Sequence, residues 1–302
     1  NENIIKSKFS IVDKTDPCYL FKSKKNSIEI KNMIQSHIKD GVALTKFIYW
    51  IKNVKKKITE LDAEKKLEEF RKKDKNYLFP SFNTIAGTGS NGAIVHYRAT
   101  SKTNKIIKKK DIFLCDSGGQ YKYGTTDVTR TLCFAKHKKK IKDIFTLVLK
   151  GHIAVVTSDL TKFNTGQKLD LRARKFLKRF NYDYGHGTGH GVGYFLNVHE
   201  GPQSLSKNNK VNLKSGMIMS NEPGYYKEGS FGIRIENLIY IKKNKFEELT
   251  LAPIEKDLIN KKFLNRTEIK WFNSYHKKVE KNLSKFMNTQ EKRELIKACS
   301  PI

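Results

Sequence analysis

Hydrophobic residues recur at helical spacing near the start of the chain and predict two helices there. Over residues 30–51 the apolar side chains follow one another four or five positions apart, behind a helix cap at Asn26 or Ser27. The segment Thr59-Glu-Leu-Asp62 matches a capping box, which predicts a second helix that ends near Lys73.

Extended, turn-rich sequence alternates with further helical patterns along the rest of the chain. Strands are predicted at residues 82–85, 93–97, 111–116, 125–134, 216–222 and 230–241. Helices are predicted at about 139–156, 167–180, 268–279 and 291–298. The order helix, helix, strands, hairpin therefore occurs twice, with negligible sequence identity between the halves. Two such halves facing each other would form one α+β domain with a cleft on an approximate two-fold axis.

Length and composition favour one large folded domain. The 302 residues are 38% hydrophobic and 11% aromatic, enough for a sizeable core. No apolar run approaches the ~20 residues of a membrane span, so no membrane partner is expected. Residues 1–25 have mixed polarity and are interpreted as an initial strand and linker from an absent upstream domain. Residues 26–302 are expected to form the main domain.

Charge and cysteine usage exclude several classes of protein. The chain has 60 basic and 30 acidic residues and a formal net charge of +30, which raises the question of nucleic-acid binding. The lysine clusters are scattered, however, and no RNA-reading aromatic motif or zinc finger accompanies them. A solvated surface is therefore favoured, and no nucleic-acid partner is expected. The four Cys lack a Cys-x-x-Cys spacing, which favours a reducing compartment over a disulfide framework.

Three of the eight His residues lie in the stretch Tyr184–Pro202. They are His186, His190 and His199, and Gly occupies every second position from 185 to 193. Each Gly costs a helix about 1 kcal/mol relative to Ala, so a helix is excluded here. An extended backbone that another group can approach closely is predicted instead.

Each predicted hairpin carries two acidic residues. Asp116 ends the first strand of one hairpin, and Asp127 lies in its second strand. Glu222 and Glu236 hold the matching positions of the other hairpin. Four buried carboxylates repel one another unless they are neutralised, and two divalent cations would balance them. With His190 as a nitrogen ligand, this donor set favours Mn²⁺, Co²⁺ or Zn²⁺, and such a site suits hydrolysis.

Each of these features alone has an ordinary structural explanation. A strand-end Asp commonly caps a turn, and Glu236 could form an ion pair with Arg234. The His-x-x-x-His spacing is a weak metal signal, and Gly187 stands where the helical zinc-protease motif has Glu. The Gly run could cradle a phosphate, but no Gly-Lys-Ser/Thr follows it. Two matched hairpins together with the His stretch favour the metal site.

Longer motifs surround these acidic and histidine residues. They are Asp116-Ser-Gly-Gly-Gln-Tyr-Lys-Tyr-Gly-Thr-Thr-Asp127, His186-Gly-Thr-Gly-His190-Gly-Val-Gly, Asn-Val-His199-Glu-Gly-Pro, Glu222-Pro-Gly-Tyr-Tyr, Gly-Ile-Arg234-Ile-Glu236-Asn and Gly-Ala-Ile-Val-His96-Tyr. Together they resemble the aminopeptidase P family (Xaa-Pro aminopeptidases), most of all its cytosolic eukaryotic type. The likeness runs from about Asn26 to the C-terminus. It implies a pita-bread fold, like that of creatinase and methionine aminopeptidase, with two pseudo-symmetric halves around a dinuclear metal cleft, and a catalytic domain over residues 26–302.

The resemblance also implies a metal-binding role for five residues. Asp116 and Asp127 would bind one metal, and His190 and Glu222 the other. Asp127 and Glu236 would bridge the two ions. The family is usually a manganese enzyme, so two Mn²⁺ ions are expected, with Co²⁺ or Zn²⁺ as alternatives. Glu222 would also act as the general base.

Five further residues would form the substrate side of the site. His96 and His199 would take part in catalysis by hydrogen-bonding the substrate or the tetrahedral intermediate. His186 would help form the pocket for the penultimate Pro of the peptide. Arg234 with Tyr226 would orient the carboxylates that bind the metals.

The implied activity is removal of the N-terminal residue from peptides with Pro at the second position, by a cytoplasmic homodimer. Prolidase or methionine aminopeptidase, of the same fold, remains an alternative. A non-catalytic pita-bread binding protein is a further alternative, but such proteins typically lose metal ligands that are all present here. Asn221 replaces the Asp that commonly precedes Glu-Pro-Gly in the family, which predicts tuning rather than loss of activity. The eukaryotic type carries one or two upstream domains that help shape the mouth of the site and the dimer, and this chain is expected to comprise essentially the catalytic domain alone.

Overall fold

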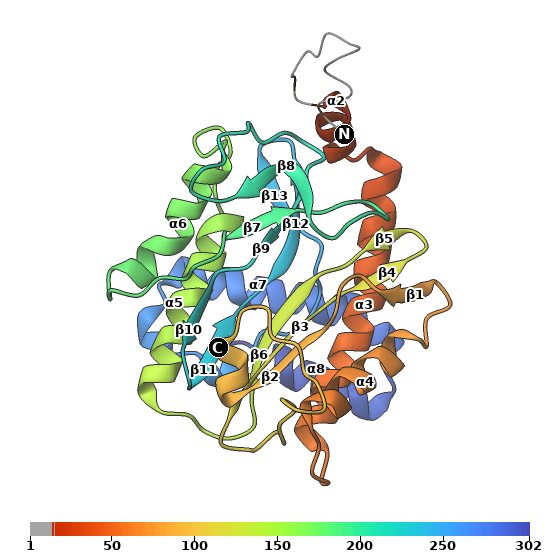
Figure 1. Ribbon diagram of the computed structural model, residues 1–302, viewed down its shortest axis with the longest axis vertical. Helices are drawn as coiled ribbons and strands as arrows, with labels where there is room; N and C mark the ends of the chain where they lie inside the picture. The colour runs from red at the N-terminus through yellow and green to blue at the C-terminus, as the bar shows by residue number, and fades with distance from the viewer. Residues whose placement is uncertain (1–13, 15) are drawn as a thin grey trace, which may run out of the picture.

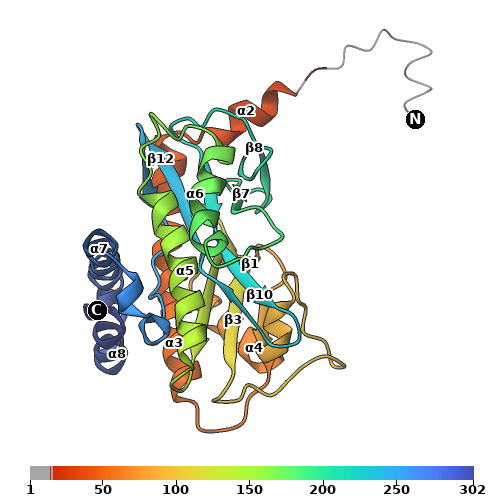
Figure 2. The ribbon, with the colours of Figure 1, turned by 90° about the vertical axis from the view of Figure 1, so that its left-hand side faces the viewer.

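Seven α-helices occur in the part of the chain that this computed structural model describes, Lys14 and residues 16–302 (Figure 1). They are α2 (Pro17–Ser23), α3 (Ser27–Asn53), α4 (Glu60–Arg71), α5 (Lys139–Val156), α6 (Gly166–Lys178), α7 (Arg266–Leu283) and α8 (Thr289–Cys299). Asn26 caps α3 and Thr59 begins α4 with a capping box, as predicted from the sequence, and the structure adds a capping box at Asn26. Figure 2 shows α7 and α8 as an outer layer, with α3 and α5 between them and the strands.

Thirteen strands in the described residues form four antiparallel sheets. They are β1 (Tyr77–Pro80), β2 (Ile85–Thr88), β3 (Ile112–Ser117), β4 (Gly119–Tyr121), β5 (Gly124–Thr125), β6 (Val128–Cys133), β7 (Gly189–Gly191), β8 (Glu200–Leu205), β9 (Ile218–Asn221), β10 (Gly224–Lys227), β11 (Phe231–Arg234), β12 (Asn237–Lys242) and β13 (Lys245–Glu248). The two main sheets have the orders β2-β3-β6 and β13-β12-β9-β7-β8. The smaller sheets are β1-β4-β5 and β10-β11.

Each main sheet is covered by its own pair of helices. In the first half, α3 and α4 pack on β2-β3-β6 around buried residues such as Phe47 and Phe113. In the second half, α5 and α6 pack on the five-stranded sheet around Leu169 and Met219. The predicted repeat of element order is therefore confirmed, and the two halves give the pita-bread arrangement expected from the motifs.

The two halves meet where β6 passes the connection between β11 and β12. The hydroxyl of Thr131 donates a hydrogen bond to the carbonyl of Arg234 at 2.9 Å. The backbone N–H of Glu236 donates to the carbonyl of Thr129 at 3.2 Å. These contacts bring the acidic hairpins of the two halves side by side.

Two predicted strands, 82–85 and 93–97, are wrong. The strands lie at β1 and β2 instead, and a 3₁₀ helix (Gly89–Ala93) with a turn occupies the second range. The buried carboxylate of Glu60 organises this segment, since it accepts hydrogen bonds from Tyr97 Oη at 2.8 Å and Asn91 Nδ2 at 3.0 Å. Side-chain bonds of this kind compete with strand pairing.

The predicted initial strand is also wrong for the described part of residues 1–25, because residues 17–23 form α2. Asp16 Oδ1 accepts a hydrogen bond from the backbone N–H of Cys18 at 2.8 Å, and Pro17 occupies the first helical position. Both are ordinary helix-start features. Residues 1–13 and 15 lie outside the described residues.

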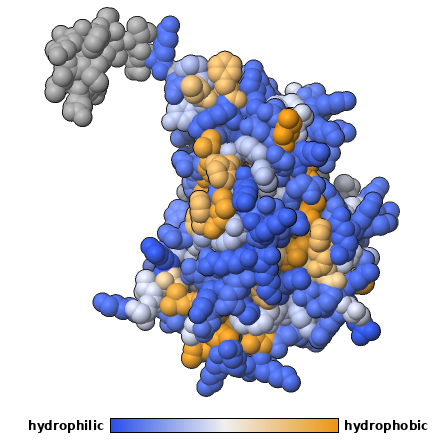
Figure 3. Space-filling view, turned by 90° about the vertical axis from the view of Figure 1, so that its right-hand side faces the viewer, coloured by the Kyte–Doolittle hydropathy of each residue, from blue (hydrophilic) through white to orange (hydrophobic). Residues whose placement is uncertain are grey.

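The lysine-rich surface is exposed to solvent. Figure 3 shows a face that is mostly hydrophilic, with hydrophobic residues in separate patches. The lysine clusters at 55–57, 108–110 and 138–140 are all exposed. None of the helices in the described residues is long and apolar enough to cross a membrane.

Helix α7 supports the segment behind the acidic hairpins through two buried side chains. Tyr275 Oη donates a hydrogen bond to the carbonyl of Ala252 at 2.8 Å. The backbone N–H of Ile254 donates to His276 Nε2 at 3.1 Å, so this nitrogen carries no proton in the fold. Burial, together with the nearby positive charges of Arg130 and Lys256, lowers the pKa of His276 to about 3.

We expect His276 to make the protein less stable as the pH falls below neutrality. Below pH about 6.5 the unfolded chain protonates this imidazole, whereas the folded chain resists protonation down to pH about 3. The free energy of unfolding should therefore fall by up to about 1.4 kcal/mol per pH unit from this residue. Urea unfolding at pH 7.5, 6 and 5 measures the slope, and His276→Gln, which keeps an acceptor for Ile254, should have the shallower slope. Parallel slopes for the two proteins would contradict this.

Candidate metal centre

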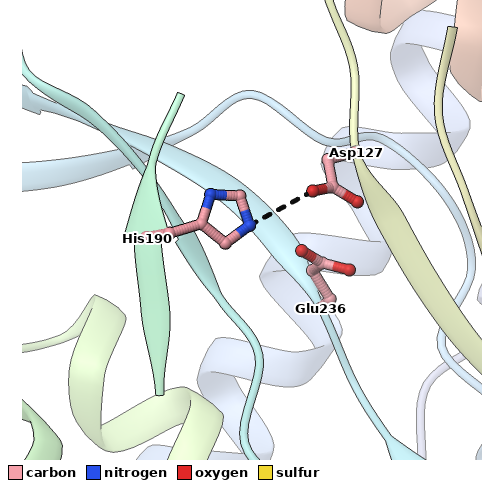
Figure 4. A group of neighbouring side chains, drawn as sticks. All are labelled: Asp127, His190 and Glu236. Carbon is pink, nitrogen blue, oxygen red and sulfur yellow. Dashed lines mark ion pairs between the residues drawn. The ribbon is translucent and has the colours of Figure 1, made fainter. Parts of the chain in front are cut away.

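Three predicted metal ligands converge between the two halves. Potential ligand atoms of Asp127, His190 and Glu236 all lie within 4.8 Å of one another. Figure 4 shows the imidazole of His190, on β7, pointing toward the two carboxylates on the opposite side. Asp127 lies between β5 and β6, and Glu236 lies between β11 and β12. The Nε2 atom of His190 is 3.4 Å from Asp127 Oδ2 and 3.4 Å from Glu222 Oε1, so Glu222 belongs to the same cluster.

Asp116, the fifth predicted ligand, is held at the end of a hydrogen-bonded chain. The guanidinium of Arg234 pairs with Asp116 Oδ2 and donates to Tyr226 Oη at 2.7 Å. Tyr226 Oη in turn lies 2.8 Å from His186 Nε2. The second oxygen of Asp116, Oδ1, is buried and has no hydrogen-bond partner among the described residues.

The electrostatics of this cluster call for positive charge. Burial raises the pKa of Asp116, Asp127 and Glu236, and the neighbouring carboxylates raise each of them further. Arg234 is the cation that opposes this effect, and one guanidinium does not balance four carboxylates. A divalent cation fits this environment, because the donors are carboxylate oxygens with one imidazole and the Asp116 Oδ1 atom is free to bind it.

Two hydroxyl groups that the sequence analysis missed orient the acidic ligands. Thr129 Oγ1 donates to Glu236 Oε2 at 2.7 Å. Ser220 Oγ donates to Glu222 Oε1 at 2.9 Å and accepts from the backbone N–H of His190 at 2.9 Å. Strand alternation in the sequence could have indicated these two hydroxyl groups. Thr129 lies two residues from Asp127, and Ser220 lies two residues from Glu222, so in a strand each would share the face of its acidic neighbour.

Arg130, also missed, fixes the backbone behind the cluster. It is 1% exposed and donates to the carbonyls of Glu236 at 2.6 Å and Pro253 at 3.0 Å, and to Tyr275 Oη at 2.9 Å. No carboxylate pairs with it among the described residues. Its charge is therefore spread over neutral oxygens, and it holds the Glu236 backbone in place.

The stretch Tyr184–Pro202 lines one wall of the site, but only β7 (Gly189–Gly191) and the start of β8, from Glu200, are regular strand within it. A Cβ atom on Gly189 would lie 1.9 Å from the carbonyl oxygen of Ser220, and one on Gly191 would lie 2.4 Å from that of Glu200. The close approach predicted at these two positions is therefore made by neighbouring backbone and not by a ligand. The neighbouring strands β9 and β8 occupy that space, so the Gly residues permit tight packing around His190.

A cavity of about 620 Å³ opens beside the ligand cluster. All five predicted ligands line it, together with His96, His186, His199 and Arg234. His186 is half-buried, whereas His96 and His199 are exposed. The ring centroids of His190 and His199 are 3.9 Å apart. The surrounding protein excludes part of the water around both rings and so lowers the pKa of His186 and of His199, and His190 lowers that of His199 further, which favours neutral imidazoles that can donate or accept hydrogen bonds.

Tyr226 is the predicted site residue that does not line this cavity. It contributes through its bonds to Arg234 and His186, and burial raises its pKa to about 12. Asn221, at the end of β9, is buried, and its Nδ2 donates to the carbonyl of His152 on α5 at 3.0 Å. A carboxylate could not donate this bond.

A second group of potential ligands, Cys133, Glu255 and Asp257, is less suited to a metal. The ammonium of Lys52 already pairs with Glu255 Oε2. Burial and Glu255 raise the pKa of the Cys133 thiol to about 12, so it is protonated at neutral pH. The cluster around His190 is therefore the better candidate.

Two family profiles together match almost the whole chain. The sequence profile of metallopeptidase family M24 matches residues 31–243, and that of the C-terminal region of this peptidase family matches residues 243–302. A probable Xaa-Pro aminopeptidase P of Paracoccidioides brasiliensis (strain Pb03) is 45% identical over 289 residues, which cover 89% of this chain and 47% of that protein. An uncharacterized peptidase of Schizosaccharomyces pombe is 44% identical over 299 residues, with 93% and 50% covered.

Solved structures of peptidases also match this chain. The X-prolyl aminopeptidase of Caenorhabditis elegans, described as a cytosolic enzyme with a di-nuclear active site, matches with a TM-score of 0.91 and 35% identity over 95% of this chain and 50% of that one. Prolidase from Pyrococcus furiosus matches with a TM-score of 0.67 and 28% identity over 77% and 66%. The chain spans about half the length of the curated relatives it matches.

We predict that His190→Ala weakens metal binding much more than His199→Ala does. His190 points at the carboxylates, and its loss should lower the affinity for Mn²⁺ by about 100-fold. His199 is the matched control, because it is a neighbouring imidazole on the same wall whose ring nitrogens do not come within 4.0 Å of a carboxylate oxygen of Asp127 or Glu222. Isothermal titration of each metal-free variant with MnCl₂ measures the affinities. Equal losses in both variants would contradict the assignment of His190.

Proposed function

This chain belongs to metallopeptidase family M24, and we propose that it is an Xaa-Pro aminopeptidase, which hydrolyses the first peptide bond of peptides with Pro at the second position. The single observation that carries hydrolysis is the convergence of Asp127, His190 and Glu236 beside a cavity large enough for a peptide end. The Pro preference is supported by the relatives named as Xaa-Pro aminopeptidases at about 45% identity.

Two divalent cations are the proposed cofactor. Asp116 and Asp127 would hold one cation, His190 and Glu222 would hold the other, and Asp127 and Glu236 would contact both. When bound, the cations would supply the positive charge that lowers the pKa of a water molecule and polarises the scissile carbonyl. We propose Mn²⁺ first, with Co²⁺ and Zn²⁺ as alternatives that the same donors accommodate.

The protein's own groups would handle the proton and the developing charge. Glu222 would accept a proton from the attacking water, and the bond from Ser220 to its Oε1 fixes the direction of the carboxylate. His199 and His96, on the cavity wall, would donate hydrogen bonds to the oxygen on which negative charge develops. A neutral imidazole suits this role because it keeps one N–H donor without adding charge.

The series of hydrogen-bonded side chains that ends at Asp116 would orient the substrate. Tyr226 and Arg234 fix His186, which we assign to the pocket for the Pro ring. Arg234 also holds Asp116 and so couples the substrate side of the cavity to the metal side. We further propose a homodimer in the cytoplasm, in keeping with the cytosolic description of the C. elegans enzyme.

A tripeptide panel tests the proposed specificity. We expect kcat/KM for an Xaa-Pro-Xaa peptide to exceed that for the matched Xaa-Ala-Xaa peptide by about 100-fold, because the His186 side of the cavity would fit the Pro ring. Release of the N-terminal amino acid, quantified by chromatography, is the measurement. Equal cleavage of the Pro and Ala peptides would refute the assignment.

The same panel separates the related activities and tests the metal. Cleavage of Gly-Pro dipeptide without any tripeptide would indicate a prolidase, and cleavage of Met-Ala-Ser alone would indicate a methionine aminopeptidase. Metal removal by chelation should abolish the activity, and added Mn²⁺ should restore it. Full activity after verified metal removal would contradict the proposed cofactor.

A further inference from the structure

A buried ion pair outside the metal centre joins the start of the domain to its second half. The Nζ atom of Lys25 pairs with Glu200 Oε1, and the two side chains are 0% and 2% exposed. Lys25 Nζ also donates to the carbonyl of Ser23 at 3.4 Å. The other carboxylate oxygen, Glu200 Oε2, has no hydrogen-bond partner among the described residues. The ammonium of Lys25 is therefore the close positive charge that compensates the burial of the Glu200 carboxylate.

Glu200 directly follows His199 and begins β8, so a shift of Glu200 would also move His199. Strand β8 is an edge strand in the order β13-β12-β9-β7-β8, so only β7 pairs with it. Strand β7 has three residues, and the register of the pair shifts between His190 and Gly191. Few ladder hydrogen bonds therefore fix β8, and an edge strand of this kind needs support from elsewhere.

Lys25 is itself firmly anchored. Its backbone N–H donates to the carbonyl of Gly216 at 2.9 Å, and Lys24 forms a β-bridge with Met217. These contacts lie at the start of β9, the strand that leads into Glu222. Burial lowers the pKa of Lys25 and the Glu200 carboxylate counteracts this, so the charge of the ammonium also depends on the pair. Lys25 lies before residue 31, where the match to the family profile begins.

We propose that Lys25 is a positioning residue, which acts through Glu200 to hold β8 in place and thereby sets the orientation of His199 beside His190. The imidazole rings of these two His are in contact, with centroids 3.9 Å apart, so a small shift of β8 would redirect the N–H of His199. A misplacement of about 1 Å can lower an enzymatic rate by about 100-fold. The inference rests on the proposed function, in which His199 binds the substrate.

A double-mutant cycle tests whether Lys25 acts through His199. For an Xaa-Pro-Xaa peptide, Lys25→Met should lower kcat by about 10-fold or more, with KM and the affinity for Mn²⁺ changed by less than about 3-fold. In the His199→Ala background the same substitution should change kcat by less than about 2-fold, since the group it positions is gone. An equal fall of kcat in both backgrounds would overturn the proposal.

Lys22→Met is the matched control for the loss of a lysine near Glu200. Its Nζ atom lies 4.0 Å from Glu200 Oε2, and its side chain is 41% exposed, so kcat should stay unchanged. Urea unfolding establishes that every variant is folded at the assay temperature. If Lys25→Met does not fold, Glu200→Gln replaces it, because the amide keeps an acceptor for Lys25 but lacks the charge. The same non-additivity with His199→Ala is expected.

Hydrogen exchange provides a readout that is independent of activity. In the metal-free protein, Lys25→Met should speed amide exchange within β8 and leave β12 unchanged, whereas Lys22→Met should alter neither strand. Unchanged exchange in β8 would overturn the role of Lys25 even if the enzyme cleaves Xaa-Pro peptides. If Lys25→Met speeds exchange in β8 but the wild-type protein cleaves no peptide, the role of Lys25 in holding β8 stands and the proposed function is overturned.

Discussion

Electrostatic repulsion among buried carboxylates is the constraint on which the rest of this structure depends. Asp116, Asp127 and Glu236 are all at least nine-tenths buried, and burial raises the pKa of each. Their close approach is stable only if positive charge lies among them. Arg234 supplies one unit of charge at the edge of the cluster. Bound cations are the proposed source of the remaining charge, since the fold is arranged so that carboxylate oxygens and one imidazole face the same space.

The two-halved architecture explains how residues far apart in sequence reach this space. Each half contributes one hairpin, and hydrogen bonds between β6 and the β11–β12 connection place the hairpins side by side. Thr129 and Ser220 then fix the direction of individual carboxylates, and Arg130 fixes the backbone behind them. Helices α3, α5, α7 and α8 lie on one side of the strands (Figure 2), and the cavity beside the ligand cluster is lined by residues of the strands and loops.

Much of this arrangement could be predicted from the sequence, because the patterns that define it are local. Capping boxes at Asn26 and Thr59 mark the starts of α3 and α4, and the paired acids of the hairpins indicate the cluster. The failures occur where tertiary contacts override local pattern. The turn before Tyr97 is organised by the distant Glu60, and the packing of Gly189 against β9 depends on a strand about thirty residues away in the chain.

Metal stoichiometry tests the central claim most directly. The purified protein is stripped of metal, dialysed against micromolar Mn²⁺ and analysed by inductively coupled plasma mass spectrometry beside an equilibrium unfolding measurement. The charge balance of the cluster predicts about two ions per chain. It also predicts a higher free energy of unfolding at neutral pH with the metal than without it. Fewer than about one ion per chain with Mn²⁺, Co²⁺ and Zn²⁺ alike, and a stability that does not respond to these metals, would contradict the account.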